Sequence, residues 1–158
     1  MFVEFGTPNS GIGSFVWASL SANPQLWAVN LIRTNIPNSS GLQAIGLIFD
    51  SGSSYINAPN ADMTILTNML KLNVSGCYYA NYMINCPCTA STNMDATFPA
   101  ISLTFGDTAG SVVMTLTGAA YMVYSSNNVC TSLIRGNVAL DAPGINYWLL
   151  GLPVYRSF

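Results

Sequence analysis

The stretch Ala44-Ile45-Gly46-Leu47-Ile48-Phe49-Asp50-Ser51-Gly52-Ser53-Ser54 decides the fold. Its apolar half predicts a buried strand over 44–49, and the small polar residues that follow predict a turn. Burying an ionised carboxylate without partners is costly, so the serine hydroxyls and the amides around Gly52 are the expected donors to Asp50. Asp50 is therefore the candidate functional carboxylate. The alternative is an Asp that only caps the turn.

The rest of the chain predicts mostly short strands separated by Gly, Pro, Asn and Ser. We expect strands at 15–20, 26–33, 44–49, 100–105, 111–116, 121–124, 129–134 and 147–150. After Pro59 we expect one helix, capped by Asn60, with Asp62 near its positive end and Lys71 near its negative end. The stretch Asp107-Thr108-Ala109 lies between two strands and is expected to be a hairpin turn. Residues 1–158 thus predict one mainly antiparallel all-β domain with one or two short helices.

The composition excludes several kinds of function. The 158 residues contain no histidine, which excludes Ser-His-Asp and Cys-His nucleophile pairs and histidine-bound zinc. There is no P-loop, and the four cations are too scattered to bind nucleic acid. No apolar run reaches the roughly 18 residues of a membrane span. We expect no cofactor and no metal, which leaves six carboxylates for acid–base chemistry: Glu4, Asp50, Asp62, Asp95, Asp107 and Asp141.

The cysteines and two glycosylation patterns point to an oxidising compartment. The chain has four cysteines, Cys77, Cys86, Cys88 and Cys130, without a Cys-x-x-Cys pair, which favours disulfides over a metal site. Asn38-Ser39-Ser40 and Asn73-Val74-Ser75 are acceptor patterns for N-glycans. A secreted, lysosomal or vacuolar protein is the expectation. The first five residues do not form a signal peptide, so a secreted protein would begin upstream of Met1.

An ordered set of landmarks resembles the C-terminal lobe of pepsin-like aspartic proteases over nearly the whole chain. The landmarks are Val3-Glu4-Phe5-Gly6, Gly13-Ser14-Phe15-Val16-Trp17, Leu26-Trp27-Ala28-Val29-Asn30-Leu31, Ile48-Phe49-Asp50-Ser51-Gly52-Ser53-Ser54, Ile84-Asn85-Cys86, 98–105, Tyr121-Met122-Val123, Cys130 and Trp148-Leu149-Leu150-Gly151. The resemblance implies an endopeptidase that hydrolyses polypeptide substrates with a water activated by two aspartates. This chain would supply one of them.

The resemblance also implies a role for each residue of the Asp50 turn. Asp50 would be catalytic, Ser51 would join a hydroxyl grip behind the pair, and Gly52 would place an amide near the carboxylate. Ser53 would hydrogen-bond the outer carboxylate oxygen, and Ser54 would lie near bound substrate. Leu149-Leu150-Gly151 would pack behind the turn. Cys86 and Cys130 match the lobe disulfide of the family, which leaves Cys77 and Cys88 to pair with each other.

The chain departs from the family pattern in ways that bear on its function. It has no second Asp-Thr/Ser-Gly after a buried strand, and Leu152 stands where the family usually has Asp. The N-terminal lobe, with the second aspartate and a flap tyrosine, and the final strands are therefore expected in the same parent chain but outside this sequence. A different hypothesis is a non-catalytic relative that serves as a binding or inhibitor module. A third is a homodimer in which each copy contributes Asp50, as in retroviral proteases.

Overall fold

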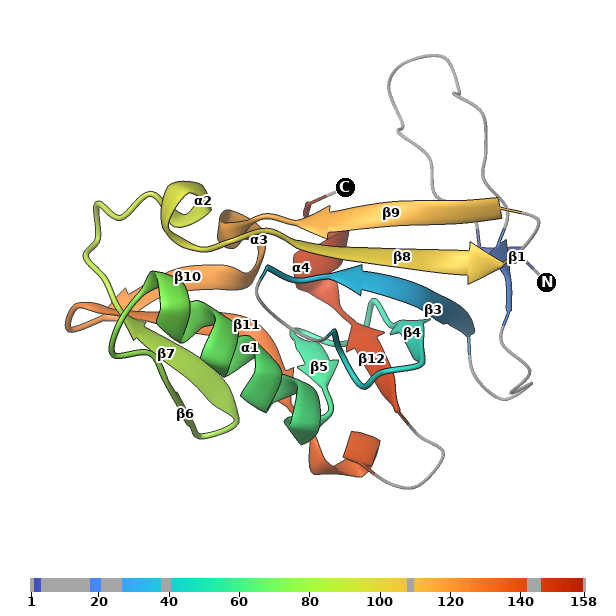
Figure 1. Ribbon diagram of the computed structural model, residues 1–158, viewed down its shortest axis with the longest axis horizontal. Helices are drawn as coiled ribbons and strands as arrows, with labels where there is room; N and C mark the ends of the chain where they lie inside the picture. Colours follow the sequence, from blue (N-terminus) through green and yellow to red (C-terminus); the bar gives the residue numbers. More distant parts are fainter. Residues whose placement is uncertain are drawn as a thin grey trace, which may run out of the picture.

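Strands dominate the described part of the chain, and the predicted mainly antiparallel β-fold is confirmed (Figure 1). The computed structural model describes residues 2–3, 18–20, 27–37, 41–107, 110–141 and 146–157. The strands are β1 (Phe2–Val3), β2 (Ala18–Ser19), β3 (Ala28–Asn35), β4 (Gly46–Phe49), β5 (Ile56–Ala58), β6 (Tyr78–Ala80), β7 (Met83–Pro87), β8 (Ile101–Asp107), β9 (Gly110–Leu116), β10 (Met122–Ser126), β11 (Val129–Gly136) and β12 (Tyr147–Leu150). The helices are α1 (Asn60–Asn73), α2 (Met94–Thr97), α3 (Gly118–Tyr121), the 3-10 helix η1 (Val138–Asp141) and α4 (Leu152–Tyr155).

Ten strands form one sheet in the order β6-β7-β11-β5-β12-β4-β3-β8-β9, and β10 pairs with β11. Two of its pairs are parallel, β12 with β4 and β11 with β5, and the other pairs are antiparallel. The last strand, β12, therefore lies between two strands from the middle of the chain. This insertion carries the end of β12 to the place where β4 ends.

In the hairpin of β8 and β9, the alternation of apolar and hydroxyl side chains along β8 gives the sheet one buried face. Ile101, Leu103 and Phe105 are buried, whereas the intervening hydroxyl side chains are half-buried. Asp107 pairs with Gly110 and accepts a hydrogen bond from its amide at 3.2 Å. The expected hairpin of the two strands is thus confirmed, while Thr108 and Ala109 of the expected turn lie outside the described residues.

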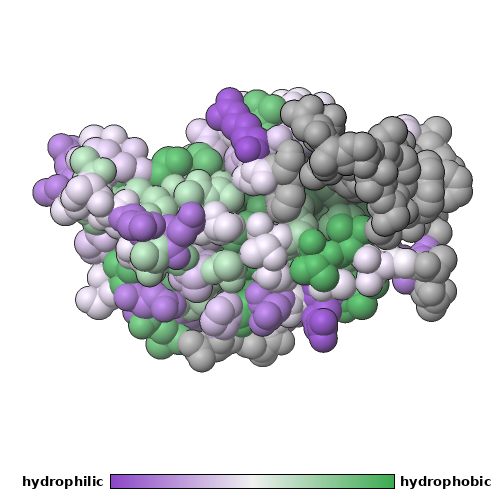
Figure 2. All heavy atoms as spheres, turned by 90° about the horizontal axis from the view of Figure 1, so that it is seen from above, coloured by the Kyte–Doolittle hydropathy of each residue, from purple (hydrophilic) through white to green (hydrophobic). Residues whose placement is uncertain are grey.

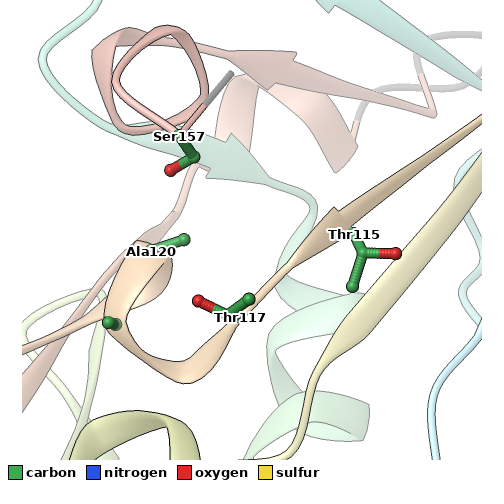
Figure 3. Close-up of a pocket in the computed structure, with 5 residues that line it drawn as sticks. Thr115, Thr117, Ala120 and Ser157 are labelled. Atoms are coloured by element: carbon green, nitrogen blue, oxygen red, sulfur yellow. The ribbon is translucent and has the colours of Figure 1, made fainter.

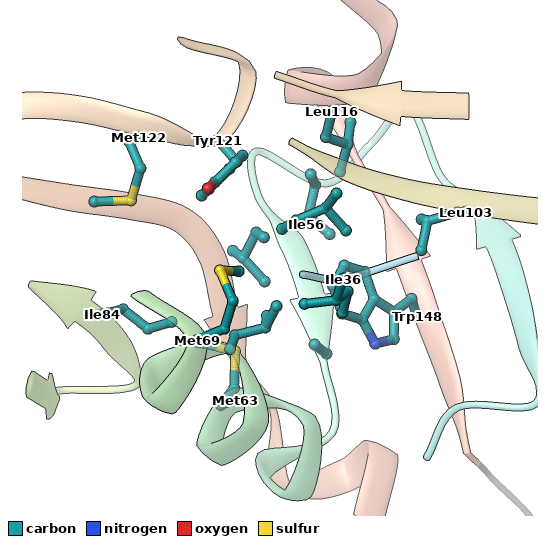
Figure 4. Packing of buried hydrophobic residues seen from close by; sticks show 14 of the residues in the cluster. Ile36, Ile56, Met63, Met69, Ile84, Leu103, Leu116, Tyr121, Met122 and Trp148 are labelled. Carbon is teal, nitrogen blue, oxygen red and sulfur yellow. The ribbon is translucent and has the colours of Figure 1, made fainter. Parts of the chain in front are cut away.

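Helix α1 covers the sheet with one apolar face (Figure 1). Its buried residues Met63, Leu66, Met69 and Leu70 recur at helical spacing. Figure 4 shows Met63 and Met69 in the same buried cluster as Ile56 of β5 and Trp148 of β12. The core therefore connects the helix to the strands around Asp50.

The predicted cap of α1 is wrong in detail. Pro59 occupies the capping position and Asn60 is already the first helical residue, so no side-chain cap bond forms there. The Asn60 amide oxygen instead accepts a hydrogen bond of 2.7 Å from the Tyr79 hydroxyl. Pro59 tolerates this position because the first amides of a helix lack intrahelical partners.

The disulfide pairing inferred from the resemblance is also wrong. The structure joins Cys77 to Cys86 and Cys88 to Cys130, with Cα separations of 4.1 and 5.7 Å. Cys86 lies opposite Cys130 in the β7–β11 register, but the residue bonded to Cys130 is Cys88, which follows directly after β7. The pairing of β6 with β7 brings Cys77 beside Cys86, and the Cys88 amide bonds Asn128 just before β11.

Candidate active site

The candidate site is built where β4 ends, beside the inserted strand β12. Their parallel register pairs Leu47 with Trp148 and Phe49 with Leu150. The Asp50 amide donates a hydrogen bond of 3.0 Å to the Leu150 carbonyl, which continues the ladder into the turn. β12 thus fixes the backbone of Asp50, the candidate catalytic residue.

The turn itself wraps around the Asp50 carboxylate. The Gly52 amide donates to Oδ1 of Asp50 at 2.9 Å, and the Ser53 amide donates to the Asp50 carbonyl at 3.2 Å. The predicted amide from Gly52 is therefore present. Asp50 is only half-buried, while Ser51, Gly52 and Ser54 are exposed. The carboxylate is held by the backbone at the surface of the molecule rather than sealed in the core.

Gly151 lies directly against the other side of the turn. A Cβ at this position would come within 2.4 Å of the Ser53 carbonyl oxygen and 2.2 Å of the Tyr55 carbonyl oxygen. The Leu152 amide donates to the Ser53 carbonyl at 2.8 Å. The expected packing of Leu149-Leu150-Gly151 behind the turn is thus observed in the described residues.

Ser53 differs from its expected role. Its hydroxyl donates to the Tyr55 carbonyl at 2.9 Å and accepts from the Asn57 side-chain amide at 2.9 Å. A hydroxyl has one proton to donate, so in this arrangement Ser53 braces the turn and does not donate to the outer oxygen of Asp50. The grip expected of Ser51 and the substrate contact expected of Ser54 stay predictions, and both side chains are exposed.

The match to a family decides how this geometry is interpreted. The model of the family described as eukaryotic aspartyl protease matches residues 3–158. The chain belongs to this family. The resemblance seen in the sequence is confirmed.

The solved structures agree on the fold of this aspartyl protease family member. Basic 7S globulin from soybean superimposes with a TM-score of 0.58 at 12% sequence identity. The match covers 82% of this chain and 34% of the globulin, so the chain spans about a third of the length of that protein. Comparison with the curated proteins gives no match.

Asp62 is a residue of this family member that the sequence placed only as a helix-terminal charge. It does lie in the first turn of α1, but its side chain is 0% exposed. Its carboxylate accepts bonds from the amides of Gln43 and Ala44 and from the Trp148 indole. No local pattern reveals these donors, because they lie 18 to 86 residues away in the sequence.

Tyr155 of α4 is a second residue that the sequence did not single out. Burial raises the pKa of the Tyr155 phenol, and the negative charge of Asp50 raises it further. Tyr155 lies only five residues after Leu150, in a helix that begins at Leu152, and the Leu152 amide bonds the Asp50 turn. This closeness in sequence to the strand expected behind the turn is the signal that could have identified Tyr155. The phenol therefore experiences the charge of the candidate catalytic group.

A hollow elsewhere on this aspartyl protease family member carries no comparable chemistry. It has a volume of about 240 Å³ and is lined by Thr115, Thr117, Ala119, Ala120 and Ser157, four of which Figure 3 labels. None of these side chains is an acid, a base or a thiol. The nearby Asp95 carboxylate accepts bonds from the Ala119 amide at 2.7 Å and from Thr117, and these bonds lower the pKa of Asp95. This arrangement anchors α3.

The described surface mixes apolar and polar groups. Figure 2 shows green apolar side chains on one face with white and purple polar ones between them. Of the helices in the described ranges, none has the length and apolar character needed to cross a bilayer. The same ranges contain no group of three His, Cys, Asp or Glu side chains placed to bind a metal ion.

Proposed function

We propose that the protein containing this chain is an aspartic endopeptidase and that Asp50 is one member of its catalytic pair. The observation that carries the proposal is the turn at Asp50, whose carboxylate receives the Gly52 amide and whose backbone is held by β12. Family membership over residues 3–158 supports the same chemistry.

The mechanism requires a second carboxylate close to Asp50. Two carboxylates at short range do not both ionise, so they share one proton. The ionised member takes a proton from a water, which attacks the peptide carbonyl, while the protonated member donates to the carbonyl oxygen. The half-exposed position of Asp50 leaves its carboxylate open to a partner and a substrate.

The second carboxylate comes, in this proposal, from an N-terminal lobe of the same parent protein. The chain spans about a third of the soybean globulin that it resembles, which is compatible with a further lobe. Polypeptides are the proposed substrates. The two disulfides favour a secreted, lysosomal or vacuolar location.

The test is a charge-removing substitution in the complete protein. Asp50→Asn should reduce pepstatin-sensitive hydrolysis of a denatured protein substrate at acid pH to background, because Asn can neither accept nor deliver the proton. Asp107→Asn is the matched control, since its side-chain oxygen can still accept the Gly110 amide in the β8–β9 turn. Substantial activity in Asp50→Asn would remove Asp50 from the mechanism.

A non-catalytic binding or inhibitor module is the second candidate function. The observation that favours it is that the structural neighbour is named as a globulin. The discriminating measurement is the sequence of the transcript upstream of residue 1. A second buried Asp-Thr/Ser-Gly supports the enzyme, and an altered triplet supports the module.

A further inference from the structure

Asp62 is a buried carboxylate in contact with three segments of the chain. It belongs to α1, and its side chain has no exposure to solvent. Its Oδ1 accepts the Gln43 amide at 2.5 Å, and its Oδ2 accepts the Ala44 amide at 3.3 Å. Oδ2 also accepts the Trp148 indole N–H at 2.8 Å. Hydrogen bonds to a charged acceptor are stronger than those between neutral groups.

These donors sit at the beginnings of the two strands that build the Asp50 turn. Ala44 precedes β4 by two residues, and Trp148 is the second residue of β12. Because β4 and β12 are parallel, their beginnings lie together at one edge and their ends at the other. At the far ends, Asp50 and Leu152 make the hydrogen bonds that form the turn.

We propose that Asp62 is a positioning residue that fixes β4 and β12 in register and thereby places the Asp50 turn against Gly151. The bond to Ala44 holds the chain entering β4, and the bond to Trp148 holds β12 relative to it. From Ala44 to Asp50 the chain advances six residues, or about 20 Å at the rise of an extended strand. Asp62 therefore acts on Asp50 through the strands and not by contact. An effect of Asp62 on catalysis rests on the proposed function, whereas its effect on the register of β4 and β12 does not.

The chemistry of the site requires an acceptor with two oxygens. All three groups donate N–H, and a carboxylate accepts on both oxygens without presenting a proton. Asn in its place would direct an NH₂ group at one of the donors. A buried donor left without an acceptor is destabilising.

The test measures native-state hydrogen exchange of backbone amides by NMR in the 158-residue chain. In Asp62→Asn, the exchange rates of the Asp50 and Leu152 amides should increase by a factor of about ten or more above the increase for the amides of the β8–β9 ladder. In the sheet order β3 separates that hairpin from β4, although Phe105 of β8 also contacts Phe49, so the hairpin reports overall stability. The variant Asp107→Asn, at the end of β8, should give no such selective increase.

A second variant covers the case in which Asp62→Asn fails to fold. Trp148→Phe removes the indole donor and keeps an aromatic ring in the core. It should produce the same selective pattern at Asp50 and Leu152, to a smaller extent. The proposal would be overturned if the exchange rates increased equally at the Asp50 turn and in the β8–β9 ladder of whichever variant folds.

The exchange result is independent of proteolysis. Selective loss of protection in the 158-residue chain, together with a complete protein that hydrolyses no peptide, would support the positioning role and remove the proposed function. Uniform exchange in the chain, together with proteolysis by the complete protein, would do the reverse.

Discussion

The Ser53 carbonyl oxygen lies 2.4 Å from the place that a Cβ on Gly151 would occupy. The backbone of Gly151 is extended, with φ −97° and ψ −161°, so the requirement for glycine here comes from space and not from a left-handed conformation. The two segments in contact are the Asp50 turn and the end of β12. Their approach joins the candidate catalytic group to the last strand of the sheet.

We expect Gly151→Ala to destabilise the chain by about 1–3 kcal/mol, the usual cost of forcing an extra methyl group into a packed site. Both nearest atoms are backbone carbonyl oxygens of the turn, so relief requires the turn itself to move. Urea unfolding monitored by circular dichroism measures the free energy. Gly52→Ala is the comparison, because its Cβ would meet only Oδ1 of Asp50, at 3.1 Å. Equal stability of Gly151→Ala and the parent chain would contradict the close contact.

The two disulfides should contribute unequally to stability. Cys88 and Cys130 are 42 residues apart and Cys77 and Cys86 only 9. On the chain-entropy model the longer loop contributes about 4 kcal/mol and the shorter about 2.7 kcal/mol. Urea unfolding of the two double Cys→Ser variants, one for each bond, checks this order.

The pairing itself is tested by partial reduction, alkylation and mass spectrometry. Trypsin does not separate the four cysteines, because they all lie between Lys71 and Arg135 with no other basic residue in that interval. Recovery of a Cys86–Cys130 bond would overturn the structure's assignment and restore the pairing that the resemblance implied.

Removing the charge of Asp50 should lower the pKa of Tyr155. Burial raises this pKa first and the Asp50 charge adds to it, because a nearby anion disfavours the phenolate. Asp50→Asn removes the second effect, so the pKa moves toward its ordinary value near 10. NMR titration of the Tyr155 Cζ carbon measures the change, with Asp95→Asn as the control. An unchanged titration in Asp50→Asn would show that the two groups do not interact.

The same shift predicts the direction of alkaline destabilisation. A group whose pKa is higher in the folded state than in the unfolded chain contributes stability that is complete below the unfolded pKa. For Tyr155 this contribution is lost as the pH rises above about 10 toward the folded value. Tyr155→Phe should therefore flatten the decline of stability with pH in that range, as measured by urea unfolding at successive pH values.

Asn73 should carry a glycan when the chain passes through a secretory pathway. Its side chain and that of Ser75 are exposed at the end of α1. The side-chain amide donates to the Met69 carbonyl at 3.1 Å, a bond that glycosylation would have to release at a cost of about 1 kcal/mol. Intact mass before and after glycosidase treatment measures occupancy, and Ser75→Ala should abolish it. The second pattern, at Asn38, lies outside the described residues, so Ser40→Ala separates the two. In Ser40→Ala, where only the Asn73 pattern remains, a mass equal to that of the unmodified chain would contradict the prediction.

The parts of the fold that follow from local pattern could be predicted. The β12 bounds of 147–150 match the prediction, and β8, β9 and β11 differ from it by one or two residues at their ends. Alternating apolar residues or a continuous apolar run define these strands. The Asp50 turn was likewise found from an apolar run followed by small polar residues.

Other parts depend on partners that are distant in the sequence. Strands β5, β6 and β7 were not predicted, because they are only three to five residues long, and β5 and β7 also contain Asn. Tyr121 ends α3 and does not begin a strand, since its buried ring and its bond to the Pro99 carbonyl hold it in the helical turn. The burial of Asp62 depends on amides and an indole from other elements. No window of the sequence around Asp62 contains that information.

The place of β12 has a consequence for the order of events during synthesis. The ribosome completes Asp50 roughly a hundred residues before it completes the strand that must slide between β4 and β5. Until that late segment emerges, the carbonyl of Ser53 has neither Gly151 nor Leu152 beside it, and the turn lacks its backing. The nascent polypeptide therefore carries its candidate catalytic acid in an unfinished setting, and that setting is completed only when translation of these 158 residues is nearly over.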